Sequence, residues 1–365
     1  MDKADSGALT AIAEVSPFAR LPTPALLVDM DRFDSNVKLA EDLFHPSGKV
    51  LRPHVKAHRT PELALLQQSH CARGVTCATV GEAEAMVDAG IDDVLIATEV
   101  VSLDKIERIA RLAARARILV AVDSRPGMEL LSLAAMREQT TVDVLIDVDV
   151  GLNRCGVRSD REAVILGWLV ATAPGLRLAG LMGYEGRLRA SNENRAARFQ
   201  TACTSIERAK AAMESEGLPV GIVSGAGTAT LMEALESPVL TEVQAGTYVF
   251  MEKDLDGLGL PFERCVTVMA TVISVWSEGA VLDAGRKSIG VDHGLPEALL
   301  PGATVFATNE EHTVLHTATP PPLTTRVMLV PTKVPTTFNL HARAWLTRGG
   351  KVERAVPVTA RGSSD

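Results

Sequence analysis

The sequence is poor in cysteine, and its cysteines follow no framework pattern. Five of the 365 residues are cysteines, and they are scattered, odd in number and never spaced as Cys-x-x-Cys. Neither a disulfide-stabilised fold nor a cysteine-based zinc site is expected, and reduced thiols predict a cytoplasmic protein. The amino terminus also lacks a basic stretch followed by an apolar core, so we expect no secretory signal.

Long apolar runs and an excess of positive charge are missing too. No apolar run approaches the roughly 20 residues that span a bilayer. The formal net charge of -8 disfavours nucleic acid or an anionic membrane as the main partner. The sequence shows no internal repeat or low-complexity tract. Its 46% hydrophobic residues suffice for the core of one large α/β domain with a smaller second domain.

Short β-rich runs alternate with helical patterns over most of the chain. Eight runs end, in order, at Lys56, Val80, Thr98, Asp123, Asp149, Gly183, Ser224 and Gly246. The clearest helical spacings of apolar residues lie at 81–89, 103–114 and 192–216. Parallel strands require such connections, and eight units predict a (β/α)8 barrel, here over residues 31–262. An open doubly wound sheet would alternate in the same way, but no Gly-x-Gly-x-x-Gly follows the first strand.

The alternation of β-rich runs and helical patterns ends at Cys265. Strand-like runs follow one another, separated by turns of Gly, Pro and Asn, without a helix of comparable length. We therefore predict a smaller β domain over residues 263–365. Residues 1–30 are predicted to be a tail and a strand that joins this β domain.

Barrel active sites are built where the strands end, which directs attention to Lys56. Lys56 closes the first strand, with His54 and His58 two residues away on either side. Strand alternation would place all three side chains on one face. Burial and neighbouring cations would favour the neutral amine, which suits Schiff-base formation. A lysine in a salt bridge at the barrel rim, with hydrogen-bonded histidines, explains the same pattern.

The seventh strand ends in the segment Ser-Gly-Ala-Gly-Thr, residues 224–228. Its glycines would let backbone amides approach an anion, and Thr228 would start a helix whose amino end favours negative charge. Loops after strands seven and eight of barrels frequently hold a phosphate. A tight turn in which glycine avoids strain is the alternative, and the position in the barrel favours phosphate.

Other polar residues near strand ends have both functional and structural interpretations. Arg154 could simply form an ion pair with Asp149 or Asp147, and Tyr184 could pack at the barrel mouth. His312 lies in the predicted β domain, where a histidine is more often structural than catalytic.

Together these segments resemble one family, the D-threonine aldolases and D-serine dehydratases, which are fold-type III pyridoxal-phosphate (PLP) enzymes related to alanine racemase. The matching segments run in the family order, and the later ones are closer to the aldolase branch. They read LPTPALLVDMDRFDSN, RPHVKAHRT, VTCATVGEAEAM, DVDVGLNRCGV, SGAGT, EVQAGTYVFME and VLDAGRKSIGVD.

The resemblance implies a cofactor site. Lys56 would bind PLP covalently, Arg154 would face the pyridine nitrogen, and Tyr184 would lie close to the cofactor. The phosphate would be bound by Ser224, Gly225, Gly227 and Thr228. Tyr248 would close this pocket, and His54 would also contact the cofactor. The β domain would complete the site for a small amino-acid substrate, in a homodimer.

One segment departs from the family pattern. The family's divalent metal is held by a Pro-x-His-x-Asp or Pro-x-His-x-Cys segment near the carboxyl end, whereas residues 331–335 here read PTKVP. Lys333 replaces the histidine and Pro335 the carboxylate or thiolate, and neither can be that ligand. We therefore predict no metal. Lys333 would supply positive charge near the substrate instead, and His312 would be the base.

The resemblance thus predicts a PLP-dependent lyase that cleaves a β-hydroxy D-amino acid by a retro-aldol reaction without metal. A racemase or epimerase, or a dehydratase, would use the same lysine and is the alternative. A PLP-binding protein with a regulatory role is a third possibility.

Overall fold

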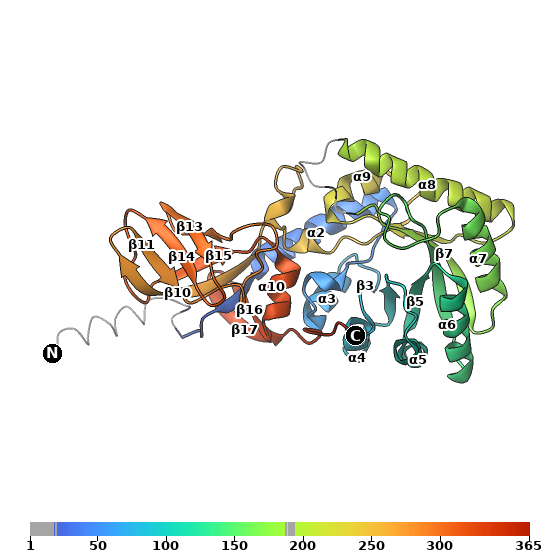
Figure 1. Cartoon of the computed structure of the whole chain (residues 1–365), viewed down its shortest axis with the longest axis horizontal. Coiled ribbons are helices and arrows are strands. Elements are labelled where there is room, and N and C mark those ends of the chain that lie inside the picture. Colours follow the sequence, from blue (N-terminus) through green and yellow to red (C-terminus); the bar gives the residue numbers. More distant parts are fainter. Residues whose placement is uncertain (1–17, 19, 187, 189–193) are drawn as a thin grey trace. The chain divides into compact units, whose positions relative to one another are not determined.

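The computed structural model describes residues 18, 20–186, 188 and 194–365 (Figure 1). It divides into two compact units. The strand-rich unit comprises the described parts of Met1–Asn36 with Val249–Asp254 and Pro261–Arg361; the barrel unit comprises Val37–Tyr248, Leu255–Leu260 and Gly362–Asp365. Because the chain passes between the units several times, the predicted boundaries at residues 30 and 262 stay predictions. No helix in the described ranges is both long and apolar enough to cross a membrane.

The barrel unit is built on eight strands that pair only in parallel, in the order β2-β9-β8-β7-β6-β5-β4-β3. The strands are β2 (Val50–Leu51), β3 (Val75–Cys77), β4 (Asp93–Ile96), β5 (Arg117–Val122), β6 (Val142–Asp147), β7 (Leu176–Gly183), β8 (Ile222–Gly225) and β9 (Glu242–Val243). Isolated parallel bridges, Leu51 to Ala72 and His54 to Thr76, join the first segment to the second. These bridges link the two ends of the sheet and confirm the predicted α/β barrel class.

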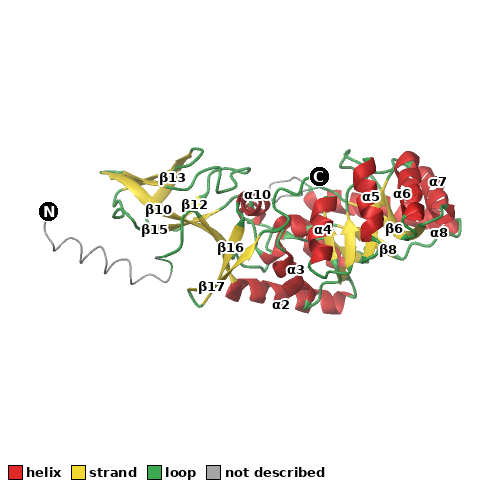
Figure 2. Ribbon diagram, turned by 90° about the horizontal axis from the view of Figure 1, so that it is seen from below, coloured by secondary structure: helices red, strands yellow, loops and turns green. Residues whose placement is uncertain are grey.

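Helices follow the strands and surround them, as the red ribbons of Figure 2 show. They are α3 (Pro61–Gln68), α4 (Val80–Asp88), α5 (Leu103–Leu112), α6 (Arg125–Arg137), α7 (Asp160–Thr172), α8 (Arg195–Ser215) and α9 (Leu231–Glu236). The predicted start of α8, at 192, lies outside the described residues. Local sequence explains several starts: Thr79 and Ser159 each accept a hydrogen bond from the backbone N–H three residues later, in α4 and α7.

An ion-pair network links charged residues at the amino-terminal ends of β4, β5, β6 and β9 to Arg52, which directly follows β2. Arg52 is fully buried and pairs with Asp93 at 2.6 Å and with Glu242 at 2.8 Å. Arg117 then bridges Asp93 and Asp143. Residues at this end of a barrel usually serve stability, so the network leaves the opposite end for chemistry.

The strand-rich unit begins with β1 (Ala25–Asp29), which pairs antiparallel with β10 (Val266–Trp276) and parallel with β16 (Arg343–Arg348). The remaining elements are β11 (Gly279–Leu282), β12 (Glu297–Ala298), β13 (Ala303–Thr308), β14 (Thr313–Thr317), β15 (Arg326–Val330), β17 (Lys351–Pro357) and α10 (Val334–Leu340). The strand-rich second domain is thus confirmed. Helix α2 (Met30–Ser47) starts in this unit, where Phe33, Phe250 and Phe338 pack with ring centroids 5.9 and 5.2 Å apart.

Candidate active site

The lysine expected to bind the cofactor lies on a helical turn, not on a strand. β2 ends at Leu51, and Lys56 is the central residue of a 3-10 turn, η1 (Val55–Ala57), called the Lys56 turn below. Pro53 has no backbone N–H to continue a strand ladder. The expectation that His54, Lys56 and His58 share one strand face is therefore wrong, because alternation stops before His54.

The two histidines beside Lys56 lie in different surroundings. His58 is buried and accepts a hydrogen bond from the backbone N–H of Thr60 at Nδ1, 3.1 Å away. His54 is also buried, but its Nδ1 has no hydrogen-bond partner among the described residues. Burial, followed by the charge of Lys56, lowers the pKa of His54 well below its usual value. His54 is therefore a neutral imidazole with an unused buried nitrogen.

Tyr184 brings two cations together. It follows β7, and its ring lies 6.0 Å from Nζ of Lys56 and 5.6 Å from Cζ of Arg154. Both distances are within the range in which a cation is attracted to an aromatic ring. Three segments far apart in sequence thus converge at the carboxyl ends of the barrel strands.

Arg154 is positioned by the loop that follows β6. Oδ1 of Asp149 accepts hydrogen bonds from the backbone N–H groups of Gly151 and Asn153, at 3.1 and 2.9 Å. Asp149 forms an ion pair with Arg158. Arg154 instead lines a small cleft together with Asp147, Leu152, Cys155 and Tyr184. The loop therefore presents Arg154 toward Tyr184.

The segment 224–228 is called the glycine turn below. Two of its positions have backbone constraints, and a third has room for a side chain or ligand. A Cβ at Gly225 would lie 2.4 Å from the carbonyl oxygen of Gly183, so only glycine fits there. Ala226 has a φ of 59°, in the left-handed region. A Cβ at Gly227 would meet the Tyr184 ring at 3.6 Å, an ordinary contact. Gly227 therefore lies beside the residue that also contacts Lys56 and Arg154.

Hydroxyl groups of the glycine turn are engaged by other side chains. Ser224 donates to Glu242 at 2.7 Å and accepts from Gln244 at 3.0 Å. Thr228 accepts from the hydroxyl of Thr247 at 3.2 Å. Thr228 begins a 3-10 turn, η2 (Thr228–Thr230), that continues directly into the six-residue α9, so the helical segment starts at Thr228 as expected and its α-helical part starts at Leu231. Phosphate binding by these residues stays a prediction.

A buried carboxyl lies behind the glycine turn. The backbone N–H of Gly227 donates to the hydroxyl of Thr230 at 3.3 Å, and this hydroxyl donates to Glu185 at 2.5 Å. Burial raises the pKa of Glu185 to about 7. The sequence analysis gave Glu185 no role.

Tyr248 lies in the turn η3 (Thr247–Val249) and is almost completely buried. Its hydroxyl oxygen accepts a hydrogen bond from Nε2 of Gln67, 2.9 Å away, and burial raises its pKa. Gln67 was missed by the sequence analysis. The available signal was a polar residue in the buried stripe of α3, which also contains Leu63 and Ala64.

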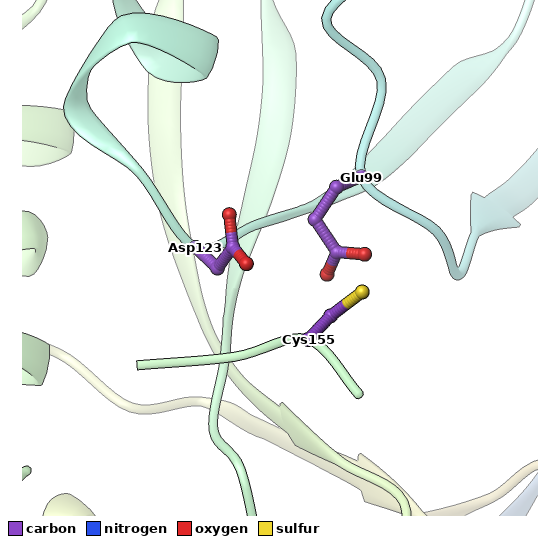
Figure 3. Close-up of side chains that lie close together, drawn as sticks. All are labelled: Glu99, Asp123 and Cys155. Carbon is purple, nitrogen blue, oxygen red and sulfur yellow. The ribbon is translucent and has the colours of Figure 1, made fainter. Parts of the chain in front are cut away.

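A second group of ionisable side chains also escaped notice. Glu99, Asp123 and Cys155 point toward one another, and one ligand atom from each lies within 4.8 Å of the others (Figure 3). Burial, with the charge of Glu99 next, raises the pKa of nearby Asp147 to about 8. A hydrogen bond to Glu99, followed by burial, raises the pKa of the Cys155 thiol to about 11. Carboxyl groups are thus concentrated here, and burial together with the neighbouring Glu99 favours the protonated form of Asp147.

The other two candidate residues lie in the strand-rich unit. Lys333 precedes α10, and its Nζ lies 3.2 Å from the carboxylate of Glu252, which is buried. Glu252 also accepts a hydrogen bond from the backbone N–H of Val334 at 3.0 Å. Pro335 lies in the first turn of α10, a position that suits proline. His312 is exposed on the turn between β13 and β14.

Comparison with known proteins agrees with this geometry. Residues 28–254 match the alanine racemase N-terminal domain, and residues 265–347 match a serine dehydratase domain. The chain is 37% identical to a D-threonine aldolase of Arthrobacter sp, over 95% of both proteins. It is 33% identical to a 3-hydroxy-D-aspartate aldolase of Paracoccus denitrificans (strain Pd 1222), over 94% of this chain and 93% of that protein.

Solved structures give the same result. The crystal structure of a D-threonine aldolase from Filomicrobium marinum superposes with a TM-score of 0.91 at 38% identity, covering 94% of this chain and 97% of that one. A D-threo-3-hydroxyaspartate dehydratase from Delftia sp. HT23 superposes with a TM-score of 0.85 at 25% identity, covering 93% and 98%. The chain therefore belongs to the alanine racemase N-terminal domain family, in the D-threonine aldolase and D-serine dehydratase branch of fold-type III PLP enzymes.

Proposed function

We propose that this protein is a PLP-dependent lyase that cleaves a β-hydroxy D-amino acid by a retro-aldol reaction. The observation that carries the proposal is the convergence of Lys56 and Arg154 on the Tyr184 ring at the carboxyl ends of the barrel strands. Similarity to a D-threonine aldolase along 95% of the chain supports the same reaction. The dehydratase relatives are less similar, at 28% identity, and support the alternative less.

The residues present fit PLP. The unused Nδ1 of His54 is a buried acceptor that a ligand hydroxyl could satisfy. The open side of Gly227 faces Tyr184, where a phosphate or ring could approach the backbone closely. Lys56 would hold the cofactor covalently, and Ser224, Gly225, Gly227 and Thr228 would bind its phosphate. The chemistry that PLP supplies when bound is an electron sink for a bond broken at the substrate's α-carbon.

The chain's own residues would orient and tune this group. The Arg154 guanidinium is always charged and has only hydrogen-bond donors, with no acceptor atom. It would therefore disfavour protonation of the pyridine nitrogen that it faces. Tyr184 would hold the cofactor in place by packing. Tyr248, fixed by Gln67, would close the pocket beside the glycine turn. Neutral His54 can accept a hydrogen bond but carries no charge to oppose that of Lys56.

Metal independence belongs to the same proposal. The support is chemical: an ammonium and a proline replace the two ligands of the family segment, and the ammonium is paired with Glu252. His312 would accept the proton of the substrate's β-hydroxyl. Lys333 would contribute positive charge near the substrate.

A cytoplasmic location and a homodimer complete the proposal. All five cysteines are free, which suits a reducing compartment. The homodimer rests on the family resemblance.

Borohydride reduction followed by peptide mapping tests the cofactor site. The pyridoxyl group should appear on Lys56, and Lys56→Ala should abolish the absorbance of the lysine-linked cofactor. Lys49 is the matched control, because its Nζ is held by the carbonyl oxygens of Ser237 and Leu240. Label on any lysine other than Lys56 would contradict the assignment.

Incubation with D- and L-β-hydroxy amino acids then separates the reactions. An aldehyde together with glycine or another simple amino acid indicates the proposed aldolase. Ammonia and an oxo acid would indicate a dehydratase instead, and inversion alone a racemase.

A further inference from the structure

A buried chain of hydrogen bonds crosses the barrel unit through Gln67. Nε2 of His58 lies 3.2 Å from Oε1 of Gln67, and Nε2 of Gln67 lies 2.9 Å from the hydroxyl oxygen of Tyr248. All three residues are only 1% exposed. Because Nδ1 of His58 accepts from the N–H of Thr60, the hydrogen of the neutral ring is on Nε2 and is donated to Gln67. The direction of both hydrogen bonds is therefore defined.

The two ends of this chain reach the two anchors of the proposed cofactor site. The backbone N–H of His58 donates to the carbonyl oxygen of Val55 at 2.9 Å and so closes the Lys56 turn. Tyr248 directly follows Thr247, whose hydroxyl donates to Thr228 of the glycine turn at 3.2 Å. The Lys56 turn and the glycine turn are thus connected through side-chain hydrogen bonds and short backbone links, although some 170 residues separate them in sequence.

Packing alone does not require a polar side chain at position 67. A leucine has a similar volume and would suit the buried stripe of α3 beside Leu63 and Ala64. It would, however, leave the Nε2–H of His58 and the hydroxyl oxygen of Tyr248 without the partner that Gln67 provides. An amide at this position therefore serves the geometry of its two neighbours.

We propose that Gln67 is a positioning residue that keeps the Lys56 turn and the glycine turn in register, so that one PLP molecule is held at both ends. This inference rests on the proposed function, because it takes the two turns to be the lysine and phosphate anchors. Gln67 acts through His58 and Tyr248 and touches no reacting atom in this scheme.

Three variants test the idea in the full-length protein. Gln67→Leu removes both hydrogen bonds at nearly constant volume. Gln67→Glu is the conservative rescue, because a protonated carboxyl offers the same carbonyl acceptor and one donor. Gln68→Leu is the matched control, since Gln68 is the next residue of α3 and is partly exposed.

Retention of PLP and the absorbance of the lysine-linked cofactor are the first readouts. Gln67→Leu should raise the dissociation constant for PLP on the order of tenfold, as expected for the loss of one or two buried hydrogen bonds. Gln67→Glu should recover most of this loss, and Gln68→Leu should bind as the parent does. Combined with Tyr248→Phe, Gln67→Leu should add little, because both changes break the same chain. If the double variant raised the dissociation constant for PLP by the product of the two single effects, the proposal would be overturned.

Hydrogen exchange in the cofactor-free protein gives a readout that needs no PLP. Gln67→Leu should speed exchange in residues 55–60 and also in residues 224–230, whereas Gln68→Leu should change neither. A folded Gln67→Leu variant with unchanged exchange in either segment would overturn the coupling. Failure of the parent protein to bind PLP at Lys56 is a different result, and it would reject the proposed function instead.

Discussion

Arg52 and Glu242 form an ion pair that is buried on both sides, with Nε of Arg52 2.8 Å from Oε2 of Glu242 and exposures of 1% and 4%. The other carboxylate oxygen of Glu242 accepts the hydrogen bond of Ser224, at 2.7 Å. The amino-terminal ion network of the barrel is thereby in direct contact with the first residue of the glycine turn.

Removing Arg52 should therefore destabilise the protein strongly. Arg52→Met leaves the buried carboxylate of Glu242 without its ion-pair partner, which typically costs about 3–5 kcal/mol, whereas the partly exposed Asp93 keeps its pair with Arg117. Denaturant unfolding measures the change. Arg115→Met is the control: its pair with Asp88 is exposed, and such pairs contribute about 1 kcal/mol or less. Equal losses in the two variants would contradict the importance of the network.

Enlarging Gly227 should weaken cofactor binding more than folding. An added Cβ makes only ordinary contact with Tyr184, so Gly227→Ala should fold normally. Gly227→Leu would extend into the space beside Tyr184, and losing a charge-assisted contact of about 1.5–3 kcal/mol should lower PLP affinity more than tenfold. Fluorescence titration with PLP measures this. Gly221→Leu, at an exposed position upstream, is the control and should leave PLP affinity unchanged. A folded Gly227→Leu variant that binds PLP like the parent would show that the glycine turn does not bind the phosphate.

His58 should make the protein less stable in mild acid. Burial lowers its pKa from 6.5 to about 4, so between these values the unfolded chain binds a proton that the folded chain does not. The free energy of unfolding therefore falls as pH falls through this window, by at most about 3 kcal/mol at 1.36 kcal/mol per pH unit. Urea unfolding at pH 7.5 and 5.0 should show a smaller loss for His58→Gln than for the parent. The exposed His45→Gln variant should match the parent, and an identical loss in all three would refute the assignment.

Activity should survive exhaustive chelation, and added manganese or magnesium should not raise it. The reason is that residues 331–335 offer an ammonium and a proline where the family segment offers two ligands. Loss of activity on chelation, restored by a divalent ion, would reject metal independence. The Lys333→Met variant tests the role of the lysine separately from metal independence, because it removes the ammonium that lies 3.2 Å from Glu252. Full activity in a folded Lys333→Met variant would leave metal independence intact and exclude the lysine from the mechanism.

The alternation of runs predicted a parallel α/β sheet, and the count of eight strands together with the missing Gly-x-Gly-x-x-Gly favoured the barrel over an open doubly wound sheet. Barrel active sites lie where the strands end, and this rule led to Lys56, Arg154 and Tyr184. The ordered segments identified the family. The exact backbone at Lys56 was not accessible in this way. The pattern continued through Pro53 to Lys56, whereas β2 ends at Leu51, His54 makes only an isolated bridge to Thr76, and residues 55–57 form a 3-10 turn.

Side-chain networks escaped the sequence analysis altogether. Gln67 and Tyr248 are 181 residues apart, and no local period links them. Glu99, Asp123 and Cys155 come from the loops after three successive strands, where each looks like an ordinary loop residue. Helix α10 was also missed, because its seven residues are too short to establish a helical period.

The pairing of β1 also has a consequence for synthesis on the ribosome. Leu27 of β1 pairs with Trp345 of β16, 318 residues later, whereas the barrel unit is contained almost entirely in one continuous stretch of chain. At about 5–20 residues per second, β1 waits roughly 15–60 s for this partner strand after it has been made. The edge of β1 that pairs with β16 stays open during that whole time, although β10 can cover the other edge earlier, and open edges are prone to pair with other chains. The nascent protein is therefore most exposed to aggregation at its first strand, after the barrel has been translated and before the last strands emerge.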